Sequence, residues 1–172
     1  MRPLLIALMT LACAAGLRAE PSGTFRHAHN VGYGAQSSLD PAASGRVIQI
    51  IEKIQSRLVR PGPDGTPAPD LATGWRPNAD GTVWRFDLRE GVRFHDGTPL
   101  TAAAVKFTFD RMLDDEHPMH GTGPFPLSLF FAPVVESTEA VDDRTVRFTL
   151  KAPHAPFLSD LAHPVAMIVS PE

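Results

Sequence analysis

The chain has 172 residues, of which 43% are hydrophobic and 20% charged, a composition that can bury a core and is unlike that of a disordered protein. The 16 basic and 19 acidic residues give a formal net charge of −3 and form no Lys/Arg run, which argues against partners such as nucleic acid or an anionic membrane surface. The single cysteine, Cys13, excludes an intrachain disulfide and a cysteine-based zinc site.

The N-terminus has the pattern of a secretory signal peptide. Arg2 supplies a positive charge, residues 4–15 are apolar apart from Thr10, and Ala19 offers a small residue at the cleavage position. We expect cleavage after Ala19, so that residues 1–19 are the signal peptide and the mature chain begins at Glu20. The apolar run is too short to span a membrane stably, so we expect a periplasmic protein with no integral membrane segment after cleavage.

A second interpretation of the N-terminus makes Cys13 a lipid-attachment site, which would anchor the protein to a membrane. The apolar run before Cys13 is short, and Thr10 fits a lipidation motif poorly. The lipid anchor at Cys13 is therefore the minor alternative, and cleavage after Ala19 the preferred one.

Hydrophobic periodicity and turn residues predict the elements of the first half of the chain. Apolar residues from Val47 to Leu58 recur at helical spacing behind Ser44, a candidate N-cap. Further on, aromatic residues alternate with Arg85 and Asp87, as in a half-buried strand. The expected elements are a strand at residues 24–28, a helix at 44–58, an irregular or helical stretch at 67–75 and a strand at 83–88.

The second half predicts a helix followed by a hairpin. Thr101 is a natural N-cap, and the apolar residues after it lie on one helical face. The expected elements are a helix at residues 101–113, a polar loop at 114–126, strands at 134–141 and 145–150, a short helix at 155–162 and a buried apolar run at 165–169. Because strands and helices alternate without βαβ regularity, the expected fold class is α+β.

The adjacent His95 and Asp96 invite comparison with a catalytic pair. A histidine and an aspartate need a positioned nucleophile to form a triad, and the sequence has no GxSxG motif. Gly97 beside them indicates a turn, and Thr101 indicates the helix cap that follows. We therefore expect no catalytic residues, and a secreted hydrolase is the less favoured alternative.

The histidines also permit a metal hypothesis. His27 and His29 alternate on an expected strand, and His117 and His120 share a loop. Zinc or nickel needs three or more converging ligands with supporting groups around them, and the sequence has no HxxxH motif. We expect neither a metal site nor a cofactor.

Four segments of the chain form a longer pattern, namely Leu58-Val59-Arg60, residues 64–72, Trp75 and residues 80–102. In order and spacing they closely resemble the family of bacterial extracellular solute-binding proteins that includes the periplasmic oligopeptide- and dipeptide-binding proteins of ABC importers. Weaker likeness at residues 39–41, 142–146 and 152–158 extends the resemblance over residues 24–172.

The resemblance implies a two-lobed periplasmic-binding-protein-like fold with the ligand enclosed between the lobes. Residues 20–172 would be the N-terminal portion of the first lobe with its small subdomain, a mixed sheet with flanking helices in an incomplete lobe. The end at Glu172, directly after an apolar run, looks like truncation. The chain departs from the family at Ala103 and Ala104, where acidic residues are common, and at Ser56 and Arg57, where a Glu-Gly pair is usual.

The resemblance also implies a function without catalysis. The chain would be part of the substrate-binding component of an ABC importer, a monomer that captures peptides or similar small solutes for the permease subunits. The expected ligand-binding residues are Ala43, Ser44, Gly45, Arg46, Met119, His120 and Gly121, although Ser44 is equally explained as a helix cap. Because one lobe cannot close over a ligand, we expect the chain alone to bind peptide weakly or not at all, and a truncated remnant without binding activity is the main alternative.

Overall fold

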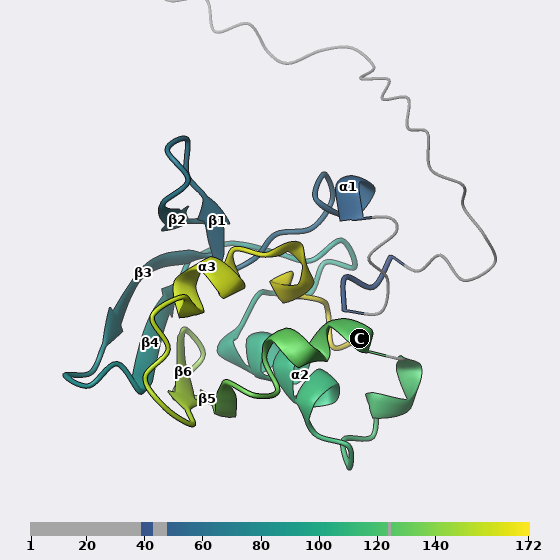
Figure 1. Cartoon of the computed structure of the whole chain (residues 1–172). Coiled ribbons are helices and arrows are strands. Elements are labelled where there is room, and N and C mark those ends of the chain that lie inside the picture. The colour runs from purple at the N-terminus through teal and green to yellow at the C-terminus, as the bar shows by residue number, and fades with distance from the viewer. Residues whose placement is uncertain (1–38, 43–47, 124) are drawn as a thin grey trace, which may run out of the picture. The chain divides into compact units, whose positions relative to one another are not determined.

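The computed structural model describes residues 39–42, 48–123 and 125–172, so the expected signal peptide and the strand at residues 24–28 lie outside the described residues. In chain order (Figure 1), the elements are α1 (Ile48–Ile51), β1 (Val59–Pro61), β2 (Pro67–Pro69), β3 (Ala72–Pro77), β4 (Val83–Leu88), α2 (Ala102–Leu113), β5 (Val135–Ala140), β6 (Thr145–Leu150) and α3 (Phe157–Leu161). Short 3-10 helices add η1 (His120–Thr122), η2 (Pro126–Phe130) and η3 (Pro164–Ala166).

The described strands form two sheets, and the α+β class is confirmed. One sheet is the β1–β2 ribbon, and the other has four strands in the order β3-β4-β6-β5. All described pairings are antiparallel. The described strands therefore form antiparallel sheets instead of the mixed sheet expected from the sequence. After β4 the chain forms α2 and then the β5–β6 hairpin. In this hairpin β6, and not β5, lies beside β4.

β4 is the half-buried strand that the alternating pattern predicted. Phe86 and Leu88 are buried on one face, while Arg85 is exposed on the other. The turn before β4 is fixed by Asn78, whose Oδ1 accepts hydrogen bonds from Thr82 N at 3.0 Å and Val83 N at 2.9 Å. Gly81 has φ of 74°, a left-handed conformation that favours glycine.

The helix expected at residues 44–58 is wrong at its C-terminal end. α1 stops at Ile51, and Ile54, which periodicity placed on the apolar face, is 42% exposed. Leu58 and Val59 are instead fully buried, Leu58 in a bend and Val59 at the start of β1, and Leu58 O accepts from Ala72 N at 3.0 Å. Strand pairing prevails over helical spacing here because it buries both apolar residues and includes Val59, which favours strands.

Strands replace the irregular or helical stretch expected at residues 67–75. β2 pairs with β1 through Val59↔Pro69 and Pro61↔Pro67. Proline cannot donate to a ladder, so it is found on edge strands, and each strand of a two-stranded ribbon is an edge. The prolines of β1 and β2 are therefore compatible with this ribbon.

α2 begins and packs as predicted. Thr101 Oγ1 accepts from Ala104 N at 3.3 Å, the capping bond expected of an N-cap threonine. Val105, Phe109 and Met112 are buried on one face, which packs against β5 and β6. The first turn contains no acidic residue, so the threonine hydroxyl is the side-chain group that caps the helix.

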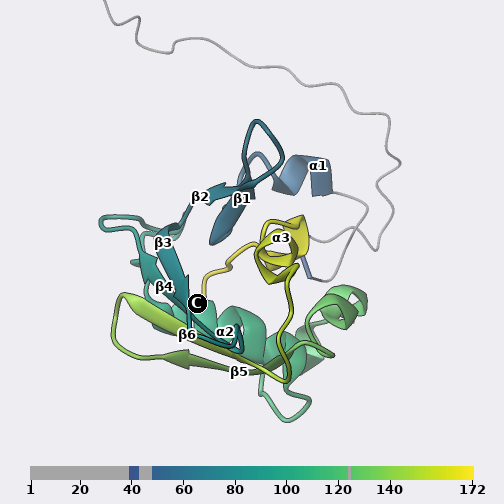
Figure 2. The same ribbon diagram turned by 60° about the vertical axis from the view of Figure 1, so that its left-hand side comes forward.

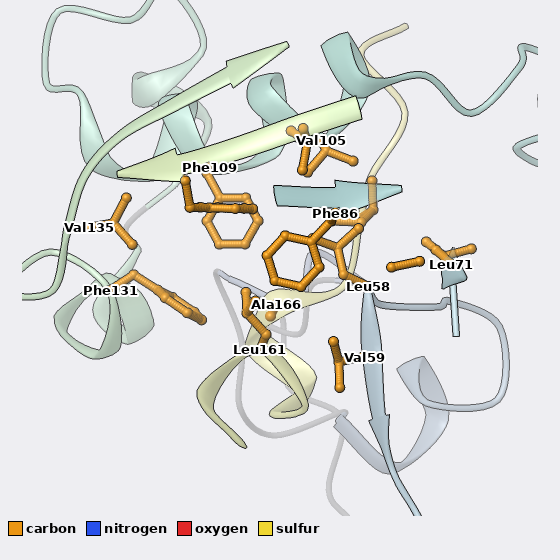
Figure 3. Close-up of a cluster of buried hydrophobic side chains, with 14 of the residues drawn as sticks. Leu58, Val59, Leu71, Phe86, Val105, Phe109, Phe131, Val135, Leu161 and Ala166 are labelled. Carbon is orange, nitrogen blue, oxygen red and sulfur yellow. The ribbon is translucent and has the colours of Figure 1, made fainter. Parts of the chain in front are cut away.

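The core is built around aromatic rings contributed by β4, β6, α2 and α3. Phe148 is central, with its ring centroid 4.9 Å from Phe109, 5.5 Å from Phe157 and 5.6 Å from Phe86. Figure 3 shows Phe86 and Phe109 between the strands and the C-terminal segment that carries Leu161 and Ala166. Each fully buried Phe side chain contributes about 1.5–3 kcal/mol relative to an exposed one, so this cluster holds the sheet to its helices.

The last segment returns to the first. Ile168 N donates to Ser56 O at 2.9 Å, and Arg57 Nη1 donates to Ala162 O at 2.6 Å, so α3 lies beside β1 (Figure 2). None of the described non-glycine residues has a positive φ, so Arg57 does not need the backbone freedom of the glycine usual in the family. Its side chain instead bonds to Ala162, which lies 105 positions further along the chain.

Candidate functional site

The three predicted site residues that the structure describes lie just beyond α2. Met119 precedes η1 and is 42% exposed, and nothing lies within 4 Å of the position that a Cβ on Gly121 would take. His120 Nδ1 lies 3.0 Å from Arg111 O and its Nε2 lies 3.4 Å from Asp115. The imidazole is therefore held against the end of α2, while Met119 and Gly121 face open space.

Arg111 is the residue that joins this loop to the turn at residues 39–42. Its guanidinium binds Asp40 through two contacts, Nη1 to Oδ2 at 2.6 Å and Nη2 to Oδ1 at 2.8 Å. The Phe125 ring centroid lies 5.2 Å from the same guanidinium, which is within the range of a cation–π interaction. Arg111 is only 5% exposed, so the pair is a buried connection between α2 and the start of the described chain.

The structure therefore describes only some of the predicted ligand-binding residues. The loop at 119–121 and the turn at 39–42 both contact Arg111, one through its carbonyl and the other through its side chain. Ala43, Ser44, Gly45 and Arg46 follow that turn directly but lie outside the described residues. Sequence reasoning missed Arg111, although its position in the last turn of α2, eight residues before Met119, is readable from the sequence.

One cavity lies away from these residues. Its volume is about 340 Å³, and its walls come from residues 54–56, Leu71, residues 92–96, Leu100 and residues 168–170. Gln55 Oε1 is buried there without a hydrogen-bond partner among the described residues. No sequence pattern indicated this cavity, because its walls come from separate segments that only the fold brings together.

His95, Asp96 and Ser170 line that cavity, so their geometry bears on the hydrolase alternative. Asp96 accepts from Thr98 N at 2.7 Å and from Thr98 Oγ1 at 2.6 Å, while Thr98 Oγ1 lies 3.4 Å from Ser170 Oγ. Hydrogen bonds from Ser170 and Thr98 hold the pKa of Asp96 below its ordinary value. A triad places the histidine between the serine and the aspartate, whereas here the aspartate side chain closes a turn in which Gly97 has φ of 88°.

Residues 39–42, 48–123 and 125–172 offer neither a metal site nor a membrane-spanning helix. No group of three or more His, Cys, Asp or Glu side chains within these ranges could hold a metal ion. His117 packs edge-on against Phe107, with the ring centroids 5.5 Å apart. None of the helices in the same ranges has the length and apolar character needed to cross a membrane.

Comparison with known proteins identifies the family. Residues 66–172 match the family described as "Bacterial extracellular solute-binding proteins, family 5 Middle". The "Di/tripeptide-binding protein 2" of Pseudomonas aeruginosa (strain UCBPP-PA14) is 42% identical over 117 residues, which cover 62% of this chain and 22% of that protein. The chain thus spans less than a quarter of the length of this curated relative.

Solved structures show the same likeness. HbpA2 from Haemophilus parasuis superposes with a TM-score of 0.73 at 30% identity over 80% of this chain and 30% of that one. The periplasmic binding protein DppA from Helicobacter pylori, solved in complex with the peptide STSA, gives a TM-score of 0.69 at 32% identity over 78% of this chain and 29% of that one. The family resemblance read from the sequence is confirmed: this chain belongs to the family 5 bacterial extracellular solute-binding proteins.

Proposed function

We propose that this chain is the N-terminal portion of the substrate-binding component of an ABC importer, which captures peptides or similar small solutes in the periplasm and delivers them to the permease subunits. The observation that carries the proposal is the fold match, at 32% identity, to a binding protein solved with a bound peptide. Family membership also favours a role without catalysis, since the matched proteins are solute-binding proteins.

The proposed ligand-contacting surface comprises residues 43–46 together with Met119, His120 and Gly121. Its support is the arrangement around Arg111, which contacts both the turn before residue 43 and the loop that carries His120. Met119 offers an exposed flexible thioether, and Gly121 leaves its backbone open to approach. Extended peptides are commonly bound through backbone groups, and bridging waters accept varied side chains.

Delivery to the periplasm follows from the proposed signal peptide at residues 1–19. Mass spectrometry of the exported protein should find Glu20 at its N-terminus. A lipid-modified Cys13 at the N-terminus would instead establish the anchored form. Export as a monomer agrees with capture of a diffusing solute, and light scattering of the purified chain tests that state.

Binding is best measured by a method that detects weak complexes, because one lobe offers few contacts. We expect alanyl-alanine, titrated into the ¹⁵N-labelled chain, to shift the amide signals of residues 119–121 with a dissociation constant above about 1 mM. Met119→Ala should reduce these shifts. Val141→Ala is the matched control, because Met119 and Val141 are 42% and 40% exposed on different segments.

Two results would contradict this proposal. Micromolar or tighter binding by calorimetry would show that the chain does not need a second lobe to hold a peptide. If the amide signals of other regions shift to saturation while those of residues 119–121 do not move, these residues are not part of the site. A complete lack of binding to peptides, together with a folded spectrum, would favour the non-binding remnant.

A further inference from the structure

Three arginines form a row on the outer face of the four-stranded sheet. The strand register places Arg76 of β3 opposite Arg85 of β4, and Arg85 opposite Arg147 of β6. Glu139 of β5 follows in the same row, opposite Arg147. We call Arg76, Arg85 and Arg147 the arginine row; they come from three strands, so they are not adjacent in the sequence.

The row faces away from the core. The neighbouring row through Trp75 and Phe86 points to the other face, where the rings of α2 and α3 pack. Side chains alternate between faces along a strand, so the arginines project from the face opposite the one that α2 and α3 cover. Figure 2 shows these two helices and the strands of the sheet. Arg76 has 66% of its side chain exposed and Arg147 has 34%.

Charge pairing on this face is incomplete. Arg76 Nη2 lies 3.1 Å from Asp87 Oδ1, and Arg147 forms an ion pair with Glu139. Arg85 is exposed and has no ion pair among the described residues, and a like charge stands opposite it on each neighbouring strand. Directly opposed like charges destabilise a sheet, so the middle arginine contributes nothing favourable to folding through its charge.

We propose that the arginine row is a docking surface for a carboxylate-rich stretch of a partner protein. Neighbouring strands lie about 4.8 Å apart, so the row presents three guanidinium groups along one line across the sheet. Guanidinium groups bind carboxylates in paired hydrogen bonds, and arginine is enriched in protein interfaces. A carboxylate seated on Arg85 would relieve the repulsion from both of its neighbours.

The acidic residues of the same face distinguish a protein partner from a polyanion. Asp87 and Glu139 lie among the three arginines, and the whole chain carries a net charge of −3. Nucleic acids and anionic bilayers are bound through summed positive charge, which these acids largely cancel. A protein can place single carboxylates opposite Arg85 and avoid Asp87 and Glu139. This surface is separate from the proposed solute site, because none of its residues belongs to that site.

The test is an NMR titration of the ¹⁵N-labelled chain, at low ionic strength, with a synthetic peptide in which single glutamates are separated by neutral residues. We expect shift changes centred on β4 and its neighbours in the sheet, and weaker binding as salt is added. Arg85→Thr should weaken binding about tenfold, as expected for loss of a charge-assisted contact, while Arg85→Lys should retain part of it. Arg60→Thr removes the same charge from the β1–β2 ribbon and should leave the affinity unchanged.

The melting temperature is an independent measurement that distinguishes loss of peptide binding from loss of the fold. Threonine favours strands and removes both like-charge contacts, so Arg85→Thr should keep or raise the melting temperature while it weakens peptide binding. The proposal is overturned if Arg85→Thr binds the glutamate peptide as tightly as the unmodified chain, or if it melts at a lower temperature. It is also overturned if heparin or phosphatidylglycerol vesicles bind the row more tightly than the peptide.

Discussion

Removing the charge of Asp40 should destabilise the fold more than removing the charge of Arg111, although the two side chains form one ion pair. The side chain of Arg111 is 6% exposed and that of Asp40 is 19% exposed. Asp40→Asn therefore leaves a guanidinium that cannot reach water. Arg111→Met leaves a carboxylate that can be hydrated and that still accepts from Ala42 N at 3.0 Å.

The magnitudes follow from this asymmetry. Breaking a buried ion pair by removing one partner costs about 3–5 kcal/mol, but the rings of Phe107 and Phe125 remain over the guanidinium and retain about 1 kcal/mol. We expect Asp40→Asn to lower the free energy of unfolding by about 3 kcal/mol. Arg111→Met keeps most of the packing and should cost about 1 kcal/mol, the net value of lost hydrogen bonds.

Urea unfolding followed by circular dichroism measures these differences, and unchanged m-values would show that the unfolded state is the same. The double variant should be about as stable as Arg111→Met alone, which corresponds to a coupling free energy of about 3 kcal/mol in magnitude. The reasoning is refuted if Arg111→Met costs as much as Asp40→Asn. It is also refuted if the two single effects add to within about 0.5 kcal/mol.

Three further changes test other parts of the structure. Gly97→Ala forces a side chain into a φ of 88° and should cost about 1 kcal/mol in chemical denaturation; a neutral effect would contradict the left-handed turn. Thr101→Ala removes the N-cap of α2 and should cost about 1 kcal/mol, whereas Thr101→Ser should not, and equal losses would argue against capping. Burial, which is the larger cause, and the positive charge of Arg57 hold the pKa of His163 below its ordinary value of 6.5. The stability contributed by neutral His163 is thus complete above pH 6.5 and lost as the pH falls through the folded-state value, so an NMR titration midpoint at or above 6.5 would contradict this environment.

Sequence patterns predicted the elements whose residues meet local requirements. α2 follows from its threonine cap and apolar face, and β4 from strict alternation. The hairpin of β5 and β6 follows from two short runs around the turn at residues 142–143, the second of which alternates. In each case the residues that decide the structure are close together in the chain, so spacing alone is informative.

Local patterns failed where distant segments decide the structure. Ile51 and Leu58 fit one helical face, yet Leu58 lies outside the helix because residues 70–72 supply its backbone partners. The site was predicted as two loops, but their connection through Arg111 depends on a contact between residues 71 positions apart. The arginine row likewise requires the register of three strands, which no run of sequence contains.

The return of the last segment to the first also bears on when this chain can fold. Phe157 covers the rings of Phe86 and Phe148, and Ile168 N reaches back to Ser56 O. A growing chain that has not yet released residues 157–168 leaves its aromatic core wet and β1 without α3 packed against it. Such long-range closure slows folding, so the polypeptide stays open at least until these residues have been synthesised.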